Sequence, residues 1–219
     1  METMQTIRLW FKKEGLAKYI SHLDLVRCMA RALKRSGLPV WYTQGFNPHI
    51  YLTFALPLSL GQESECEIMQ FRLVEELPLN EVKDRLNAAL PAGLQVLAAA
   101  LPQQDLQAIA AADYRVSLEG APGLAERFLA FAQQPQIKTL KRSKKGPKEV
   151  DIRPLVLACD GEEGEGGRAL LSLRLAAGGQ QNLNPALLID AYCAQSGESV
   201  KTASIRRTAL YDGADAPFC

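Results

Sequence analysis

Both histidines of this 219-residue chain, His22 and His49, lie near its N-terminus. The first belongs to the segment Tyr19–Leu25, which reads YISHLDL, and the second ends the segment Gln44–His49, which reads QGFNPH. Near neutral pH a histidine can accept or donate a proton, and it can also hydrogen-bond to a ligand. We therefore take His22 and His49 as the candidate catalytic residues, although no complete signature of an enzyme class accompanies them.

The same two segments supply polar and aromatic groups that could hold a substrate. Gly45 and the Asn47–Pro48 pair predict a loop, in which glycine lets the backbone come close to a ligand. Arginines and lysines follow at the spacing of one helical face, which could contact phosphates and could equally be an ordinary solvated face. The candidate substrate-binding residues are Asp24, Arg27, Arg31, Arg35, Gln44, Phe46 and Asn47.

A second basic cluster lies between residues 138 and 148, where Gly146 and Pro147 predict a turn between two strands. Such a hairpin could lie along an RNA backbone, or its charges could simply discourage edge-to-edge strand pairing. The cluster contains no aromatic residue, so it offers no platform for base stacking. The candidate RNA-binding residues are Lys138, Lys141, Arg142, Lys144, Lys145 and Lys148.

The sequence predicts neither a metal site nor a cofactor in this chain. Its five cysteines are scattered and never show C-x-x-C spacing, which argues against a zinc site or an iron–sulfur cluster. His22 and Asp24 are two residues apart on a predicted helix, so they point in different directions and do not orient each other directly. Asp24 is instead expected to cap the helix together with Ser21.

Composition places the chain among ordinary globular proteins. It is 47% hydrophobic and 22% charged, with a net charge of +1, so overall charge does not drive it towards nucleic acid or membrane. No apolar run is long enough to span a bilayer, and the N-terminus lacks the pattern of a signal peptide. We expect a cytoplasmic location without membrane contact.

The elements that must position these residues predict an α+β fold of two tandem ferredoxin-like domains with antiparallel sheets, residues 1–103 and 113–219. The first half has the order βαββαβ and the second half repeats it less clearly, with residues 103–112 as a linker. In the first half we expect strands over 6–12, 39–43, 64–74 and 94–100, a short extended segment over 51–57, and helices over 22–36 and 80–90. The first helix should face the core through Leu23, Val26, Ala30 and Leu33.

In the second half the same signals predict strands over 113–118, 137–142, 150–157, 169–176 and 200–211, and helices over 123–133 and 185–195. Residues 160–167, which combine acids with glycines, are expected to form a hairpin tip or a mobile loop.

Several strings of this chain resemble the uncharacterised radical-SAM-linked protein family. They are the two segments above, Arg31–Pro39, Leu56–Gly61, Lys148–Pro154 and Ile205–Tyr211. Members of that family are encoded beside, or fused to, a radical S-adenosylmethionine protein with a cobalamin-binding-type domain. The resemblance therefore implies such a protein as the partner, and its gene neighbourhood points towards RNA modification or processing.

Together these observations favour a non-catalytic accessory protein that binds RNA for a radical S-adenosylmethionine enzyme. Two alternatives stay open. One is a metal-independent RNA-processing endonuclease that uses a histidine as general acid or base. The other is a protein-docking module that makes no contact with nucleic acid.

Overall fold

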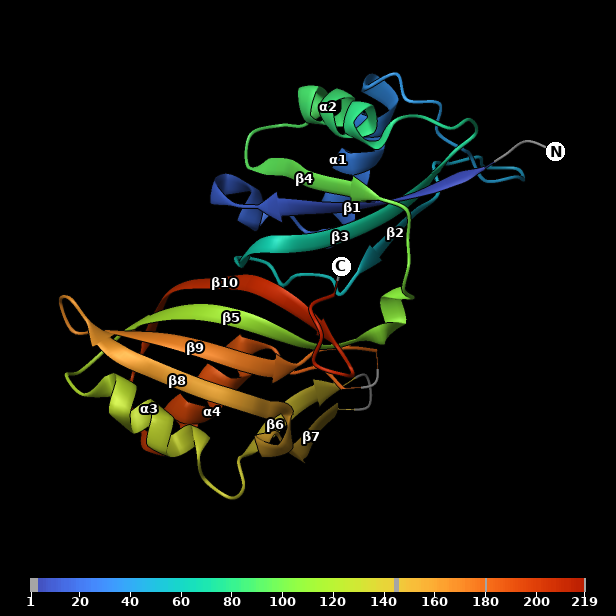
Figure 1. Cartoon of the computed structure of the whole chain (residues 1–219). Coiled ribbons are helices and arrows are strands. Elements are labelled where there is room, and N and C mark those ends of the chain that lie inside the picture. The colour runs from blue at the N-terminus through green and yellow to red at the C-terminus, as the bar shows by residue number, and fades with distance from the viewer. Residues whose placement is uncertain (1–3, 144–145, 180, 219) are drawn as a thin grey trace. The chain divides into compact units, whose positions relative to one another are not determined.

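The computed structural model describes residues 4–143, 146–179 and 181–218, without the side chains of 141–143. Within this part of the chain four α-helices accompany mostly antiparallel sheets (Figure 1). The chain divides into two compact units, unit 1 (Met1–Gln107) and unit 2 (Ala108–Phe218). None of the described helices is both long and apolar enough to cross a membrane.

Unit 1 is a four-stranded antiparallel sheet in the order β4-β1-β3-β2, with α1 and α2 on one face (Figure 1). Its elements follow each other as strand, helix, two strands, helix and strand, with one 3-10 turn. They are β1 (Gln5–Lys13), η1 (Gly15–Tyr19), α1 (His22–Arg35), β2 (Leu52–Ala55), β3 (Glu63–Leu73), α2 (Leu79–Ala89) and β4 (Leu94–Ala100).

The core of unit 1 lies between the sheet and its two helices. Alternate residues of β1 enter it, among them Leu9 and Phe11, both fully buried. α1 begins as its sequence predicts: the Ser21 hydroxyl caps it by accepting a hydrogen bond from the Asp24 amide at 3.1 Å. The cap fixes where the helix starts and therefore which of its faces meets the sheet.

That face overlaps the predicted one only in part: Leu33 is buried as predicted, and Val26 and Ala30 are partly buried. Leu25, Met29, Ala32 and Leu33 are the buried residues of α1, whereas Leu23 is 58% exposed. Both sets have helical spacing, and only contact with the sheet decides between them. The expected burial of Leu23 is wrong for this reason.

The predicted strand over residues 39–43 is not a regular strand in the structure, which has only isolated β-bridges there. Val40 bridges to Leu73 and Tyr42 to Ile50, while the regular strand next to β3 is the later segment Leu52–Ala55. The segment from 40 to 52 is thus a narrow ribbon beside β3, closed by the loop that carries His49.

Unit 2 repeats the pattern with a sheet in the order β10-β5-β9-β8 and with α3 and α4 on one face (Figure 1). A separate antiparallel hairpin, β6–β7, is inserted after the first helix. The elements are β5 (Ile109–Glu119), α3 (Leu124–Ala132), β6 (Lys138–Ser143), β7 (Gly146–Asp151), η3 (Arg153–Leu155), β8 (Val156–Gly164), β9 (Arg168–Ala176), α4 (Pro185–Ser196) and β10 (Lys201–Asp212), and η2 (Leu106–Ala108) precedes them.

Two segments of unit 2 are more regular than predicted. The expected linker 103–112 ends early, because β5 begins at Ile109 and buries Ile109, Ala111 and Ala112. The acidic segment 160–167 is mostly strand, since β8 continues to Gly164 along β9. Backbone pairing with a neighbouring strand outweighs the loop signals, which are polar residues and alanines in the first segment and glycines with acidic residues in the second.

Candidate nucleic-acid interface

The exposed face of α1 carries four cationic side chains, those of Arg27, Arg31, Lys34 and Arg35. Arg27 forms an ion pair with Asp24 at 3.1 Å, and Arg35 donates a hydrogen bond to the carbonyl oxygen of Ala89 at 2.7 Å. Within the described part of the chain, no hydrogen bond or ion pair engages Arg31 or Lys34. Two cations of this face are therefore free to meet an anionic ligand.

A shallow cavity of about 390 Å³ opens on this face. It is lined by Asp24, Arg27, Cys28, Arg31, Arg35 and Pro91. Guanidinium groups present planar forks of donors that match phosphate oxygens, so a wall of three arginines suits a phosphate better than a neutral ligand. Four residues predicted from the sequence as substrate-binding thus lie around one cavity.

Two side chains of the cavity are held in defined protonation states. Hydrogen bonds from Ser21 and Arg27 hold the pKa of Asp24 below its usual range, so that it stays a carboxylate paired with Arg27. Burial raises the pKa of the Cys28 thiol, which outweighs the nearby charges of Arg35 and Arg31. Cys28 is therefore a neutral thiol at pH 7 and not a reactive thiolate.

The Gln44–His49 segment forms an exposed loop at the end of the ribbon. Thr43 closes it, because the Thr43 amide bonds to the His49 carbonyl at 2.8 Å and the His49 amide bonds to the Thr43 hydroxyl at 3.2 Å. The Nδ1 atom of His49 lies 3.1 Å from both the Thr43 hydroxyl and the Asn47 carbonyl oxygen. These contacts fix the histidine ring and leave the predicted ligand-binding side chains Gln44, Phe46 and Asn47 exposed.

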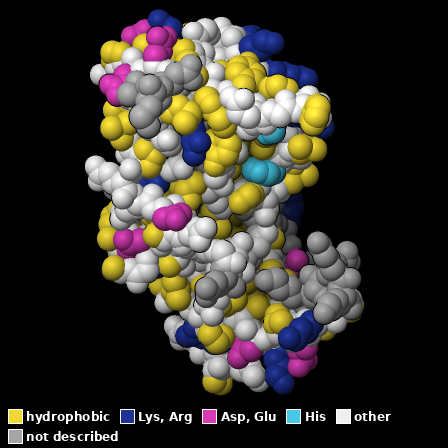
Figure 2. Space-filling view, turned by 90° about the vertical axis from the view of Figure 1, so that its right-hand side faces the viewer, with side chains coloured by type: hydrophobic (Ala, Val, Ile, Leu, Met, Phe, Trp, Pro, Cys, Tyr) yellow, Lys and Arg dark blue, Asp and Glu magenta, His cyan; other side chains and the backbone are white. Residues whose placement is uncertain are grey.

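His22 is the first residue of α1, exposed, with its ring edge-to-face against Phe54 at a centroid distance of 5.4 Å. Asp24 is occupied by Ser21 and Arg27, so no contact from Asp24 orients the imidazole. The two histidine side chains show on one face, among hydrophobic side chains (Figure 2). No group of three or more His, Cys, Asp or Glu that could hold a metal ion occurs among the described residues.

The basic cluster of residues 138–148 lies on the β6–β7 hairpin of unit 2. Its register sets Lys141 opposite Lys148, and Lys138 lies 3.6 Å from Glu149. Lys144 and Lys145 lie outside the described residues, and the side chains of Lys141 and Arg142 are not described, so their role in RNA binding stays a prediction.

Sequence reasoning missed an aromatic cluster on unit 1. The Arg72 guanidinium lies 4.8 Å from the Tyr51 ring centroid and 5.5 Å from that of Trp41, and the two rings meet edge-to-face at 6.1 Å. Trp41 and Tyr51 lie opposite each other across the ribbon, one residue beyond the bridge between Tyr42 and Ile50. The sequence signals the cluster only by an aromatic residue on each side of the predicted loop. The contribution of Arg72 depends on the pairing with β3, which the local sequence does not show.

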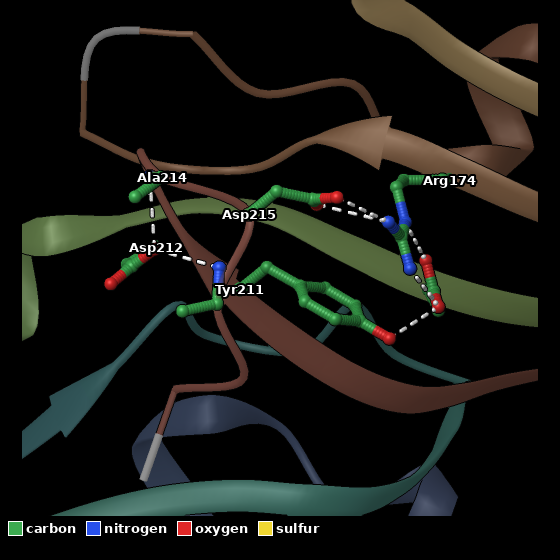
Figure 3. Close-up of polar contacts among 7 residues, drawn as sticks. Arg174, Tyr211, Asp212, Ala214 and Asp215 are labelled. Atoms are coloured by element: carbon green, nitrogen blue, oxygen red, sulfur yellow. Dashed lines mark hydrogen bonds and ion pairs between the residues drawn. The ribbon is translucent and has the colours of Figure 1, made fainter.

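A second missed cluster lies on the helix-free face of the unit 2 sheet. Arg174 forms a two-pronged ion pair with Asp113 at 2.7 and 3.0 Å and binds Asp215 at 2.9 Å, and the Tyr211 hydroxyl donates to Asp113 at 2.9 Å (Figure 3). Asp113 and Arg174 also line a cavity of about 370 Å³. Burial alone would raise the pKa of Asp113, but the hydrogen bonds from Arg174 and Tyr211 hold it below its usual value.

The fold and these surfaces define a mixed α/β protein with antiparallel sheets and an arginine-lined cavity. The chain belongs to the family described as an uncharacterized protein conserved in bacteria (DUF2344), which matches residues 6–185. The comparison with curated proteins found no match.

The comparison with solved structures found several matches, three of which follow. A chain from the crystal structure of a Cbf5–Nop10–Gar1 complex matches with a TM-score of 0.55 and 12% identity, over 93% of this chain and 48% of that one. This chain therefore spans about half the length of that relative. An unknown protein from Galdieria sulphuraria matches with a TM-score of 0.25 and 14% identity, over 91% and 97% of the two chains. A putative glycine cleavage system transcriptional repressor matches with a TM-score of 0.23 and 11% identity, over 94% and 99%.

Proposed function

We propose that this chain is a non-catalytic accessory protein that binds RNA on behalf of a radical S-adenosylmethionine enzyme. The observation that carries the proposal is the cavity on α1 walled by Arg27, Arg31 and Arg35. Phosphate contacts supply most of the sequence-independent affinity of proteins for nucleic acids, and arginine forks suit them well. The basic β6–β7 hairpin adds a second set of cations.

We also infer that both units are ferredoxin-like domains arranged in tandem. Unit 1 has the element order βαββαβ and the sheet order β4-β1-β3-β2. Unit 2 gives the same order when the inserted hairpin is left out, with the sheet β10-β5-β9-β8. The fold leaves one face of each sheet free of its own helices, which gives room for an extended ligand.

The proposed partner would have a hydrophobic surface to dock on. Leu16, Tyr19, Leu23 and Leu60 are between 58% and 84% exposed. The Gly61 amide bonds to the Lys18 carbonyl oxygen at 2.8 Å, which holds the loop of Leu60 against η1. Large apolar side chains gathered at one end of a unit are typical of protein interfaces. This surface favours the docking module as the second candidate function, in which the chain binds the enzyme and no nucleic acid.

Replacing Arg31 and Lys34 together with glutamine should weaken RNA binding and flatten its salt dependence. Each cation that neutralises a phosphate of a single strand contributes roughly 0.7 to the slope of log affinity against log salt, so removing two cations should lower the slope by about 1.4. The measurement is a titration of a fluorescent single-stranded RNA at several salt concentrations. The control is the double variant Lys83→Gln and Arg85→Gln, which removes the same charge from α2.

The hairpin is tested in the same assay by replacing Lys141, Arg142, Lys144 and Lys145. Equal slopes for the wild type, the α1 variant and the hairpin variant would contradict both proposed contact surfaces. Undetectable binding at low salt would leave the docking module as the remaining function. Shortened RNA on a denaturing gel, formed with EDTA present and lost on replacing His22 or His49, would instead favour the endonuclease.

A further inference from the structure

The ribbon of unit 1 turns two aromatic rings away from its core. Val40 and Ile50 are buried among the core residues of the unit. Neighbouring side chains on an extended backbone point to opposite faces, so Trp41 and Tyr51 lie on the other side. Trp41 is half-buried, and 36% of Tyr51 is exposed. The rings therefore belong to the sheet face that carries no helix of unit 1.

Arg72 packs against both rings and restricts their movement. Phe71 and Leu73 enter the core, so Arg72 points to the same helix-free face as the rings. The Trp41 amide donates to the Arg72 carbonyl oxygen at 2.8 Å, which fixes the ribbon to β3. Contact with two ring faces holds the guanidinium and both aromatics as one rigid group. A binding surface that is already ordered loses little conformational entropy when a ligand arrives.

The loop that continues this ribbon presents a further aromatic ring. Phe46 is 105% exposed, so its ring has no contact that shields it from water. Gln44, Asn47 and His49 belong to the same loop and are exposed, and their polar groups can donate and accept hydrogen bonds. The same ribbon thus carries aromatic rings for stacking and polar groups that can hydrogen-bond to the edge of a nucleobase.

We propose that Trp41, Tyr51 and Arg72 form a stacking site for a nucleobase of single-stranded RNA, with Phe46 taking another base of the same strand. The inference rests on the proposed RNA binding and adds to it the part of the RNA that this face recognises. Every base has a π-face that stacks on an aromatic ring, and a nearby arginine strengthens such a site. The flat rings and the cation together match a base better than an aliphatic side chain of a protein.

The test uses Trp41 as its own reporter. The variant Trp10→Phe keeps a ring beside Arg8 and leaves Trp41 as the single tryptophan of the chain. This protein is titrated with a single-stranded oligouridylate and with an abasic strand of the same length, which has the same phosphates and no bases. We expect the oligouridylate to quench the Trp41 fluorescence and to bind about tenfold or more tighter than the abasic strand.

Variants then assign the effect to the rings. Tyr51→Ala together with Phe46→Ala should lose about tenfold or more in affinity for the oligouridylate and keep the salt slope of the wild type. Tyr51→Phe together with Phe46→Tyr keeps both rings and should bind like the wild type. Thermal unfolding of every variant shows whether the fold is retained.

The outcomes separate the two proposals. Equal binding of the oligouridylate and the abasic strand, without quenching, overturns the stacking site and leaves phosphate binding intact. Absence of binding for both strands at low salt overturns the proposed function together with the stacking site. Loss of affinity in the alanine variant for a protein partner, with RNA binding unchanged, assigns this face to protein docking and overturns the stacking site.

Discussion

Replacing Gly93 with alanine should lower the free energy of unfolding by about 2–5 kcal/mol, through backbone strain and overpacking together. Gly93 has a φ of +87°, a conformation that residues with a Cβ atom rarely adopt. An added Cβ would lie 2.6 Å from the carbonyl oxygen of Glu14 and 2.9 Å from the Cβ atom of Ala17. Neither neighbour can move easily, because the Glu14 amide also bonds to the Gly93 carbonyl at 2.9 Å.

Gly37→Ala is the matched control. Gly37 also has a positive φ, of +68°, but an added Cβ would meet no atom within 4 Å. This substitution should cost only the strain, about 1–2 kcal/mol. Urea unfolding of both variants and the wild type measures the difference. Equal losses would mean that the close approach between the start of β4 and the end of β1 does not limit this site.

Short sequence signals predicted correctly those elements whose ends are set by a few neighbouring residues. The helix from His22 is confirmed: the Ser21 hydroxyl caps it by accepting from the Asp24 amide, and Gly37 follows its end. The strands β3 and β9 are confirmed within about two residues, since the alternating apolar positions of each strand face the core of its own unit. These features depend on residues close together in the sequence.

Contacts between distant segments decided the rest. Leu23 was wrongly predicted to be buried on α1. Two faces of this helix have apolar residues at similar spacing, and only contact with the sheet decides which face is buried. The cluster of Trp41, Tyr51 and Arg72 depends on which residue of β3 stands beside the ribbon. A change of pairing by one residue would turn Arg72 to the other face of the sheet.

The candidate site shows the same division. The cationic face of α1 could be read from helical spacing, because its members are three or four residues apart. The sequence could not show which of these cations lack a partner within the protein. Arg35, for example, donates a hydrogen bond to the carbonyl oxygen of Ala89, which belongs to α2. Sequence reasoning could not find the cluster around Asp113, because its members come from β5, β9, β10 and the segment after β10.

Replacing Asp113 with asparagine should lower the free energy of unfolding by about 1–3 kcal/mol at pH 7, a range between those for exposed and buried ion pairs. The side chains of Asp113 and Arg174 are 27% and 28% exposed, so solvent screens the pair only in part. The variant loses the negative charge that faces Arg174. The Tyr211→Phe variant removes only one hydrogen bond and keeps the ring stacked 4.0 Å from the guanidinium carbon, so it should cost about 1 kcal/mol.

The effect of Asp113 should depend on pH in a defined direction. In the folded chain the pKa of Asp113 lies below its ordinary value, because the hydrogen bonds from Arg174 and Tyr211 outweigh the effect of burial. An aspartate in the unfolded chain titrates at about 3.9. Its contribution is therefore complete above that pH and is lost as the pH falls through the lower pKa of the folded state.

Urea unfolding at pH 7, 5 and 3 tests this sign. The gap in unfolding free energy between the wild type and Asp113→Asn should be equal at pH 7 and 5 and smaller at pH 3. A gap that stays constant down to pH 3 would contradict the lowered pKa. A carboxylate held this way by Arg174 and Tyr211 is a weak proton acceptor at neutral pH. The expected result would therefore mark the cavity beside Asp113 as the surface of a structural ion network, and would not add it to the ligand surfaces proposed above, which are the cationic face of α1, the β6–β7 hairpin and the aromatic ribbon.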